Sequence, residues 1–276
     1  MPITSASYKV LDTRIDALDN ATGLARAQDL ASDQAAAHYI VLPYVEFLNQ
    51  AAQDRELQNL LNQADLSLAN GVSINWAIEY LYGGETKFSR FLATLTNIIT
   101  RPANVHRLAP SRFDSSNFTW PMLEWAAREH RKVVLIGSPK QQSIEGTAKF
   151  IQTAIPGAII AGVYPGYFHK AGRVRLIQEL RQLEPDLILV GIGFPKQEAL
   201  MHDLRNELSH GLMIGEGGSF DYELFGGSIK RAPNFIRTIG LEWLWRLIRE
   251  PARLHRQLAI PAYLWRVWRQ GRHLPE

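Results

Sequence analysis

Residues 185–198 read Pro-Asp-Leu-Ile-Leu-Val-Gly-Ile-Gly-Phe-Pro-Lys-Gln-Glu. Within 186–190, four apolar residues follow Asp186 and end at Gly191, a pattern typical of a short strand that is buried inside a sheet. Glycine interrupts the chain after this run, and a helical spacing of apolar positions follows. The segment therefore predicts one unit of buried strand, glycine-rich turn and helix.

The same order occurs three more times in the second half of the chain. Each apolar run again ends at glycine, and helical patterns follow two of these turns, over 141–154 and in a stretch rich in Arg and Leu after 168. Four such units in series predict a doubly wound α/β fold, a Rossmann-like parallel sheet with flanking helices. The runs and their turns are 132–136 with 137–139, 158–161 with 162–168, and 211–214 with 215–221.

The first half of the chain shows weaker signals of the same kind. We expect a strand at 39–42 and another at 66–69, the second ending in the turn Asn70-Gly71, because both of these residues tolerate positive φ. Helical patterns cover 45–52 and 54–64, and a further helix runs through Trp76 to Tyr82. Residues 85–115 have weak periodicity and yield no assignment.

Composition limits the kinds of protein that this chain can be. Its 276 residues are 46% hydrophobic and 21% charged, which is globular composition. The chain has no cysteine, so disulfides, thiolate metal sites and cysteine nucleophiles are excluded. Neither a signal-like start nor an uninterrupted apolar run of about 18 residues occurs, which predicts a soluble or peripheral protein. His202 and His210 lack the spacing of a metal-binding helix, and no metal site is predicted.

Positive charge is concentrated at the C-terminal end. Residues 230–276 hold ten basic residues against three glutamates, and since the whole chain carries +3, residues 1–229 carry −4. Trp243, Trp245, Trp265 and Trp268 lie among these arginines. Cations attract anionic phosphate and Trp favours lipid headgroups, so the tail is predicted to contact a membrane surface. A helix that packs on the body and a nucleic-acid site are the alternatives, and nucleic acid is the least favoured.

Parallel sheets bind ligands at the carboxyl ends of their strands, where helix N-termini present N–H groups to phosphate. One glycine turn would be weak evidence, because glycine also lets a chain leave any strand. Four turns at one edge favour a nucleotide-sized ligand. The residues predicted to bind this substrate are Gly137, Ser138, Gly166, Tyr167, Gly191, Gly193, Pro195, Lys196, Gln197, Gly217, Gly218, Phe220 and Asp221.

Two common nucleotide motifs are missing from these turns. Residues 191–196 lack the third glycine of the dinucleotide fingerprint, and the chain contains no Gly-Lys-Ser or Gly-Lys-Thr. These departures argue against nicotinamide cofactors and ATPase chemistry. No cofactor is predicted.

At this point the motifs resemble a known family. Residues 185–198, 214–221 and 230–233, with the later run 240–251, are similar to the WecG/TagA/CpsF glycosyltransferases. Weaker similarity covers 64–71, 135–138 and 165–168, and the resemblance extends from Val10 to about Leu264. It implies transfer of a hexose or N-acetylhexosamine from a UDP-sugar to a polyprenyl-diphosphate-linked saccharide, with inversion and without a metal, in cell-surface polysaccharide synthesis.

The resemblance also assigns roles to single residues. Tyr167 and Asp221 would hold the uridine, and Gln197, a candidate catalytic residue, would lie close to the diphosphate and sugar. The resemblance also implies that the chain divides into three parts. These are an acceptor side over 1–112, a nucleotide-sugar-binding part over 113–229 and a membrane-associating helical tail over 230–276. The cations expected to contact the lipid diphosphate are Lys230, Arg231, Arg237, Arg246 and Arg249.

The chain departs from the family on the acceptor side. Family members carry an Asp, the proposed general base, where this chain has Asn70, our second candidate catalytic residue; an amide can orient a hydroxyl but cannot take its proton. Leu42 and Tyr44 stand where the family has Thr and Asn. Arg107 could replace a family Arg, although residues 83–104 look like an insertion.

Three explanations remain open for this departure. Another base could act, with Asp65, His106, His169 and Glu216 available. Proton removal could come late, so that stabilisation of the leaving diphosphate dominates. The protein could also bind nucleotide sugar without transferring it, as a partner in a polysaccharide assembly complex. Under each, we expect a peripheral location on the cytoplasmic face of the cell membrane, and an apolar patch on the tail could serve a homo-oligomer instead.

Overall fold

The computed structural model describes residues 6–137, 141–166, 168–230, 232–233, 236, 245 and 259–273. Within these ranges the strands form a two-stranded hairpin and one six-stranded sheet. The strands are β1 (Ala6–Val10), β2 (Thr13–Ala17), β3 (Ala37–Val41), β4 (Leu66–Ser67), β5 (Lys132–Gly137), β6 (Ile159–Tyr164), β7 (Leu187–Gly191) and β8 (Gly211–Gly215).

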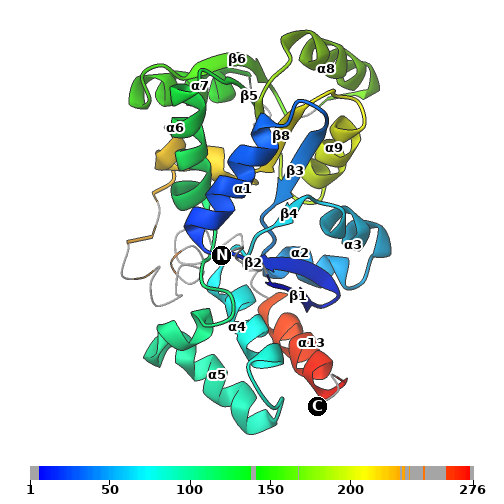
Figure 1. The fold of residues 1–276 in the computed structure, drawn as a ribbon, viewed down its shortest axis with the longest axis vertical. Coiled ribbons are helices and arrows are strands. Elements are labelled where there is room, and N and C mark those ends of the chain that lie inside the picture. Colours follow the sequence, from blue (N-terminus) through cyan, green and yellow to red (C-terminus); the bar gives the residue numbers. More distant parts are fainter. Residues whose placement is uncertain are drawn as a thin grey trace.

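The six-stranded sheet has the order β4-β3-β8-β7-β5-β6, and each neighbouring pair is parallel. Parallel neighbours require crossover connections, and helices supply them here (Figure 1). The predicted Rossmann-like parallel sheet is confirmed. Strands β3 and β4 belong to the same sheet as β5–β8, because β3 pairs with β8; the division of the chain into three parts stays a prediction.

Helices cover both faces of this sheet and extend beyond one end of it. The longer helices are α1 (Asn20–Ser32), α2 (Val45–Ala51), α3 (Arg55–Asn62), α4 (Val72–Tyr82), α5 (Phe88–Thr100), α6 (Trp120–Arg128), α7 (Gln141–Ala154), α8 (Lys170–Leu183), α9 (Lys196–Arg205) and α13 (Ala259–His273). Short turns of helix are η1 (Pro102–His106), η2 (Ser115–Thr119), η3 (Ser219–Asp221) and η4 (Glu223–Phe225).

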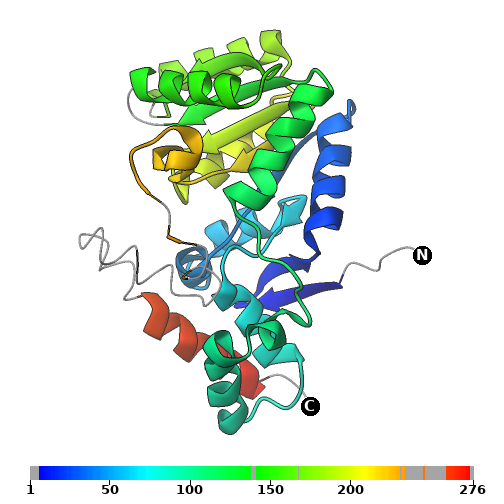
Figure 2. The same ribbon diagram turned by 90° about the vertical axis from the view of Figure 1, so that its left-hand side faces the viewer.

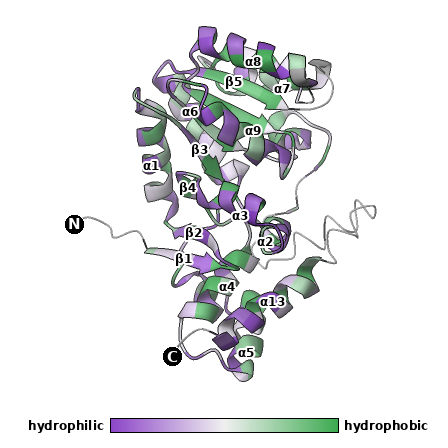
Figure 3. Ribbon diagram, turned by 90° about the vertical axis from the view of Figure 1, so that its right-hand side faces the viewer, coloured by the Kyte–Doolittle hydropathy of each residue, from purple (hydrophilic) through white to green (hydrophobic). Residues whose placement is uncertain are grey.

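The two faces of the sheet bury separate apolar cores because strand side chains alternate. In β7, Leu187 and Leu189 face the core beneath α1, α6 and α7. Ile188 and Val190 face the core beneath α2, α3, α8 and α9. Both sets are fully buried, which explains the uninterrupted apolar run in the sequence. Figure 3 shows the hydrophobic colour along β3 and β5.

A third core lies outside the sheet. It joins the hairpin β1–β2, α4, α5 and α13, with Trp76, Tyr80 and Tyr263 fully buried in it. These elements form the end of the molecule farthest from α7 and α8 (Figures 1 and 2). Helix α13, which belongs to the tail, therefore packs on the body through one side of its surface.

Helix α1 was not predicted, although it has a clear start. Asp19 Oδ1 accepts the Thr22 N–H over 2.7 Å and so caps the helix. Its buried face is made of small residues, Gly23, Ala27 and Ala31. A Cβ at Gly23 would lie 2.5 Å from the Phe113 ring, so glycine is needed for this close approach. Small residues give little hydrophobic contrast, and the pattern was missed.

Candidate active site

Four glycine turns lie along one edge of the sheet. Because β5, β6, β7 and β8 are parallel, their carboxyl ends point the same way, and Gly137 is in register with Gly191. Val190 pairs with Gly215 in the next strand. The turns that follow these strands therefore share a rim, as the sequence predicted. We call this edge the carboxyl rim, made of 137, 164–166, 191–196 and 215–221 within the described chain.

The aromatic ring of Phe220 holds part of this rim together. A Cβ at Gly137 or at Gly191 would lie 2.6 Å from Phe220 Cδ2. The ring also packs edge-on against Phe225, with 5.3 Å between the ring centroids. Glycine at the ends of β5 and β7 is thus required by the packing of Phe220. The contact with Phe220 is thus a structural reason for glycine at both positions, and it differs from the ligand approach that the sequence predicted.

The turn after β6 meets the same cluster. A Cβ at Gly166 would collide with Ile192 Cγ2 and would lie 3.2 Å from the Gly137 Cα. A Cβ at Gly191 would lie 3.2 Å from the Gly217 carbonyl oxygen. Each turn therefore lies close to at least one other, Gly166 to Gly137, Gly137 to Gly191 and Gly191 to Gly217, and this chain of close approaches gathers the four turns.

Gln197, on the first turn of α9, fixes the turn after β8. Its Oε1 accepts the Gly217 N–H over 2.8 Å, and its Nε2 donates to Glu198 Oε1 over 2.8 Å. The side chain is buried, and a Cβ at Gly215 would lie 2.6 Å from Nε2. The geometry thus gives Gln197 a positioning role; its predicted catalytic role remains a prediction.

Glu198 is buried beside this amide. Burial raises the pKa of its carboxyl to about 7, against the opposing effect of the Gln197 hydrogen bond. Glu198 Oε2 has no hydrogen-bond partner in the part of the chain that the structure describes. At a given pH, Glu198 in the folded chain is therefore protonated to a larger extent than an exposed glutamate.

A second buried carboxyl, Glu216, anchors the rim to the helices. Ser115 Oγ lies 2.8 Å from Glu216 Oε2, and Thr119 Oγ1 donates to Oε1. Ser219 Oγ donates to the Glu216 carbonyl over 2.7 Å. Burial raises the Glu216 pKa, and the hydroxyl donors oppose the rise. With its oxygens engaged, Glu216 serves to hold η2 against the turn after β8, a contact that the sequence did not reveal.

The remaining predicted rim residues are accessible. Asp221 and Lys196 are exposed, and Pro195 precedes α9. Gly193 and Gly217 have φ of 81° and 57°, with no atom within 4 Å of an added Cβ. Backbone conformation therefore explains these two glycines, and open space beside them leaves room for a ligand. Gly218 lies next to them, where an added Cβ would be 3.8 Å from Asp221 Oδ2.

Asn70 lies outside the carboxyl rim as defined, at the carboxyl end of another strand of the same sheet. It follows β4, which is separated from β8 by β3, or by roughly 10 Å at ordinary strand spacing. Its N–H donates to the Pro43 carbonyl over 3.0 Å, and Gly71, with φ of 108°, precedes α4.

Comparison with known proteins agrees with this geometry. The family model for "Glycosyl transferase WecG/TagA/CpsF family" matches residues 8–275. The chain belongs to this family. It is therefore a glycosyltransferase, and the resemblance that the motifs predicted is confirmed.

Two curated relatives of this glycosyltransferase come from Bacillus. An N-acetylglucosaminyldiphosphoundecaprenol N-acetyl-beta-D-mannosaminyltransferase of Bacillus spizizenii is 28% identical over 240 residues, which cover 87% of this chain and 82% of the relative. The protein of the same name from Bacillus subtilis is 29% identical over 223 residues, covering 81% and 76%.

The residues that depart from the family on the acceptor side lie in different environments. Leu42 is buried in the core beneath α1 and α6, so it faces away from solvent. Tyr44 directly precedes α2 and donates from its Oη to Glu46 Oε2 over 3.2 Å. Arg107 forms an ion pair with the buried Glu79, which raises the pKa of the Arg107 guanidinium.

The alternative bases do not share one place. Asp65 precedes β4, so it lies at the opposite edge of the sheet, where its Oδ2 accepts the Tyr39 N–H over 3.0 Å. His106 lies in η1, and burial lowers its pKa. His169 is exposed at the start of α8, on the side of the carboxyl rim. Of these, His169 and the engaged Glu216 are near the predicted donor turns.

Several predicted residues lie outside the described part of the chain, namely Ser138, Tyr167, Arg231, Arg237, Arg246 and Arg249. Lys230, another predicted contact of the tail, is described and is exposed.

Two further features were sought in the ranges that the structure describes. No three His, Asp or Glu side chains gather there as a metal site would require. No helix in these ranges has the length and apolarity to cross a membrane.

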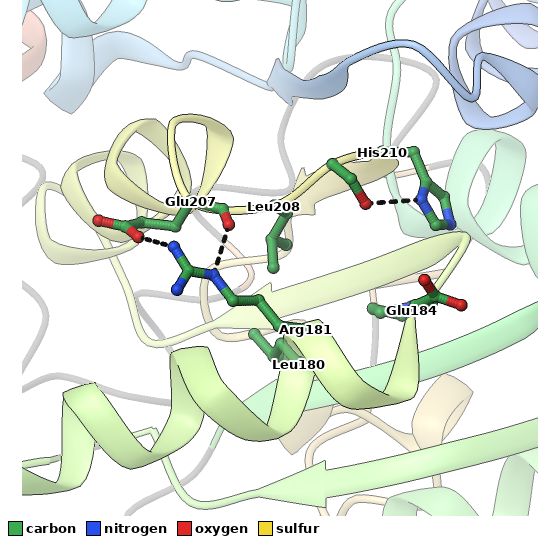
Figure 4. Close-up of a pocket in the computed structure, with 8 residues that line it drawn as sticks. Leu180, Arg181, Glu184, Glu207, Leu208 and His210 are labelled. Carbon is green, nitrogen blue, oxygen red and sulfur yellow. Dashed lines mark hydrogen bonds and ion pairs between the residues drawn. The ribbon is translucent and has the colours of Figure 1, made fainter.

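One pocket lies away from the carboxyl rim. His210, which lines it, directly precedes β8, and Pro185, which also lines it, lies two residues before the start of β7, so the pocket occupies the amino edge of the sheet. Figure 4 shows Arg181 Nε donating to the Glu207 carbonyl over 2.8 Å, beside Leu208. The Arg181 side chain also pairs with the Glu207 carboxylate. The arginine is thus held by the protein itself, and we assign this pocket no role in transfer.

Proposed function

We propose that this glycosyltransferase moves an N-acetylmannosamine-like hexosamine, or a related hexose, from a UDP-sugar to a polyprenyl-diphosphate-linked saccharide in cell-surface polysaccharide synthesis. The observation that carries the proposal is the meeting of four glycine turns at one rim. The names of the two Bacillus relatives supply the sugar and the lipid-linked acceptor.

The carboxyl rim suits a nucleoside diphosphate. Helix α9 begins there, so its positive end and Lys196 face developing negative charge. Asp221 is exposed and can accept hydrogen bonds from the uridine ribose or base. The open space beside Gly193 and Gly217 allows the diphosphate to approach the backbone closely.

The reaction we propose is a single displacement at the anomeric carbon. The acceptor oxygen forms the new bond as the bond to the UDP oxygen breaks, and the electron pair leaves with UDP. Asn70 orients the acceptor hydroxyl, whose proton leaves late, to water or to the departing diphosphate. A donor with an α-linked UDP then gives the β product that the relatives' names specify.

The proposed leaving-group stabilisation uses backbone N–H groups and cations of the chain, without a metal. Residues 230–276 would bring the arginines to the lipid diphosphate at the cytoplasmic face of the membrane, with Lys230, Arg231, Arg237, Arg246 and Arg249 as contacts. We expect no nucleic-acid partner. A second proposal is that copies of the chain associate through the tail. Sedimentation of the purified protein tests it.

One further candidate function follows from Asn70. Since an amide cannot act as a base, the chain could bind UDP-sugar within an assembly complex without transferring it. Incubation with UDP-N-acetylmannosamine and polyprenyl-diphosphate-N-acetylglucosamine separates the two. We expect UDP release and a lengthened lipid-linked product, both unchanged by EDTA. UDP binding without product would favour the binding function.

A further inference from the structure

Helix α5 carries an apolar stripe that faces solvent. Phe88, Leu92 and Ile99 have exposed fractions of 58%, 46% and 57%. Their spacing of four and seven residues places them on one side of the helix. Phe91 lies on the adjoining side of the helix, where its ring stacks on that of Phe88 at 6.1 Å and packs into the third core. The apolar surface of α5 is therefore wider than the part that the third core buries, and the stripe stays exposed within the part of the chain that the structure describes.

This stripe continues onto α13. The Phe88 and Trp268 rings meet edge to face at 6.2 Å, and Trp268 lies 4.9 Å from Trp265, which is 55% exposed. Thr86 Oγ1 donates to the Gly271 carbonyl over 2.6 Å and ties the start of α5 to α13. Helices from distant parts of the sequence thus present one surface, the α5–α13 face, at the end of the molecule shown in Figure 2.

The charge around the α5–α13 face is mainly positive, although Arg90 pairs with the buried Glu79 and Glu85 pairs with Lys87 just before α5. Phe88–Thr100 and Ala259–His273 together contain four arginines and no carboxylate. Arg269 and Arg272 are exposed, and the Arg272 guanidinium lies 5.2 Å from the centre of the Trp268 ring. Arg101 is exposed directly after α5. Apolar side chains bordered by cations and Trp are the features of a helix that lies in the headgroup layer of an anionic membrane.

We propose that the α5–α13 face rests on an anionic phospholipid bilayer, with Phe88, Leu92 and Ile99 inserted at the boundary of the acyl chains. This inference rests on the proposed membrane contact of the tail and extends it to a helix within residues 83–104, the stretch that looks like an insertion in the sequence. A second copy of the chain suits the face less well. A two-fold contact would bring the same cations together with no carboxylate on either helix to neutralise them.

Vesicle sedimentation tests the proposal with a matched pair of variants. Leu92→Glu/Ile99→Glu places charge in the stripe, whereas Val174→Glu places charge on an exposed apolar side chain of α8, at the other end of the molecule. With phosphatidylglycerol-containing vesicles we expect binding of the double variant to fall about tenfold and that of Val174→Glu to fall less than about twofold. Equal binding of the double variant and the unmodified chain would overturn the proposal.

A labelling experiment gives a second test that leaves the surface apolar. The chain has no cysteine, so Leu92→Cys and Val174→Cys each accept one environment-sensitive fluorophore. On adding anionic vesicles, we expect emission to rise and shift to the blue at position 92 and to stay constant at 174. No change at 92 would overturn the proposal. Loss of a dimer in the Leu92→Glu/Ile99→Glu variant with unchanged vesicle binding would assign the face to a second copy instead.

Discussion

Gln197 Oε1 accepts the backbone N–H of Gly217 over 2.8 Å, so a side chain at the start of α9 fixes the turn that follows β8. The donor end of the same amide is bonded to Glu198. The two turns that flank the predicted diphosphate are thus joined through one buried amide. Binding at the carboxyl rim depends on this connection in our account.

Replacing Gln197 tests that dependence. Gln197→Leu leaves the Gly217 N–H without its partner and frees the turn, so we expect UDP affinity to fall about tenfold, as the loss of one positioning hydrogen bond implies. Titration calorimetry measures the effect. Gln182→Leu, on the exposed side of α8, is the control and should bind as the unmodified chain does. Unchanged affinity in Gln197→Leu would remove the amide from the binding account.

The raised pKa of Glu198 should make the free energy of unfolding fall as pH rises. Its pKa is about 7 in the folded state because of burial and about 4.3 in an unfolded chain. The folded state therefore holds more protons between these values, and stability falls as pH rises through that window. We expect Glu198→Gln to be more stable than the unmodified chain at pH 8, by about 2–4 kcal/mol.

Urea unfolding at pH 5 and pH 8 measures this difference. Glu129→Gln, an exposed glutamate after α6, is the matched control for the loss of one carboxyl. A Glu198→Gln variant whose unfolding free energy changes with pH as much as that of the unmodified chain would show that another group causes the dependence.

The Phe220 ring sets a limit on Gly137. Because an added Cβ would lie 2.6 Å from the ring, Gly137→Ala should lower the unfolding free energy by about 1–3 kcal/mol. Gly146→Ala meets nothing within 4 Å, inside helix α7, and should raise it by up to about 1 kcal/mol. Thermal unfolding of the two variants should therefore shift in opposite directions; a shared direction would argue against the packing explanation.

Replacing Asn70 by aspartate distinguishes an active site adapted to an amide from a site that has lost its catalytic base. In our account the amide orients the acceptor, and a carboxylate there would repel the donor diphosphate, so Asn70→Asp should lower turnover. Asn206→Asp makes the same change of charge on an exposed residue after α9, at the other edge of the sheet, and should leave turnover unchanged. If the unmodified chain is inactive and Asn70→Asp gains activity, the binding function is the correct one.

The parallel sheet could be predicted because its strands are buried on both faces. Residues 187–190 point alternately into two cores, so the run is apolar throughout and stands out in the sequence. Helix α5 could not be predicted, and the structure explains why. Its apolar residues do recur at helical spacing, at 88, 91, 92, 95, 98 and 99, but Phe88 and Leu92 face solvent, so the pattern does not mark a buried side in the way that an ordinary surface helix does.

The candidate site, too, could be predicted only in part from the sequence. The glycine turns were predicted to share an edge, and the close approach of Gly166 to Gly137 confirms that they do. The sequence could not show that Phe220 packs on Gly137 and Gly191, since a ring contact across strands leaves no local pattern. The hydrogen bond from Thr119 to Glu216 also joins distant residues, so only the folded chain reveals how the rim is held.

Amide hydrogen exchange with and without UDP tests the binding of the donor at the carboxyl rim most directly. Our account predicts that UDP slows exchange in residues 191–198 and 215–221, and leaves 180–185 and 207–210, at the amino edge, unchanged. Protection at the amino edge, or no protection in either rim segment at saturating UDP, would contradict it.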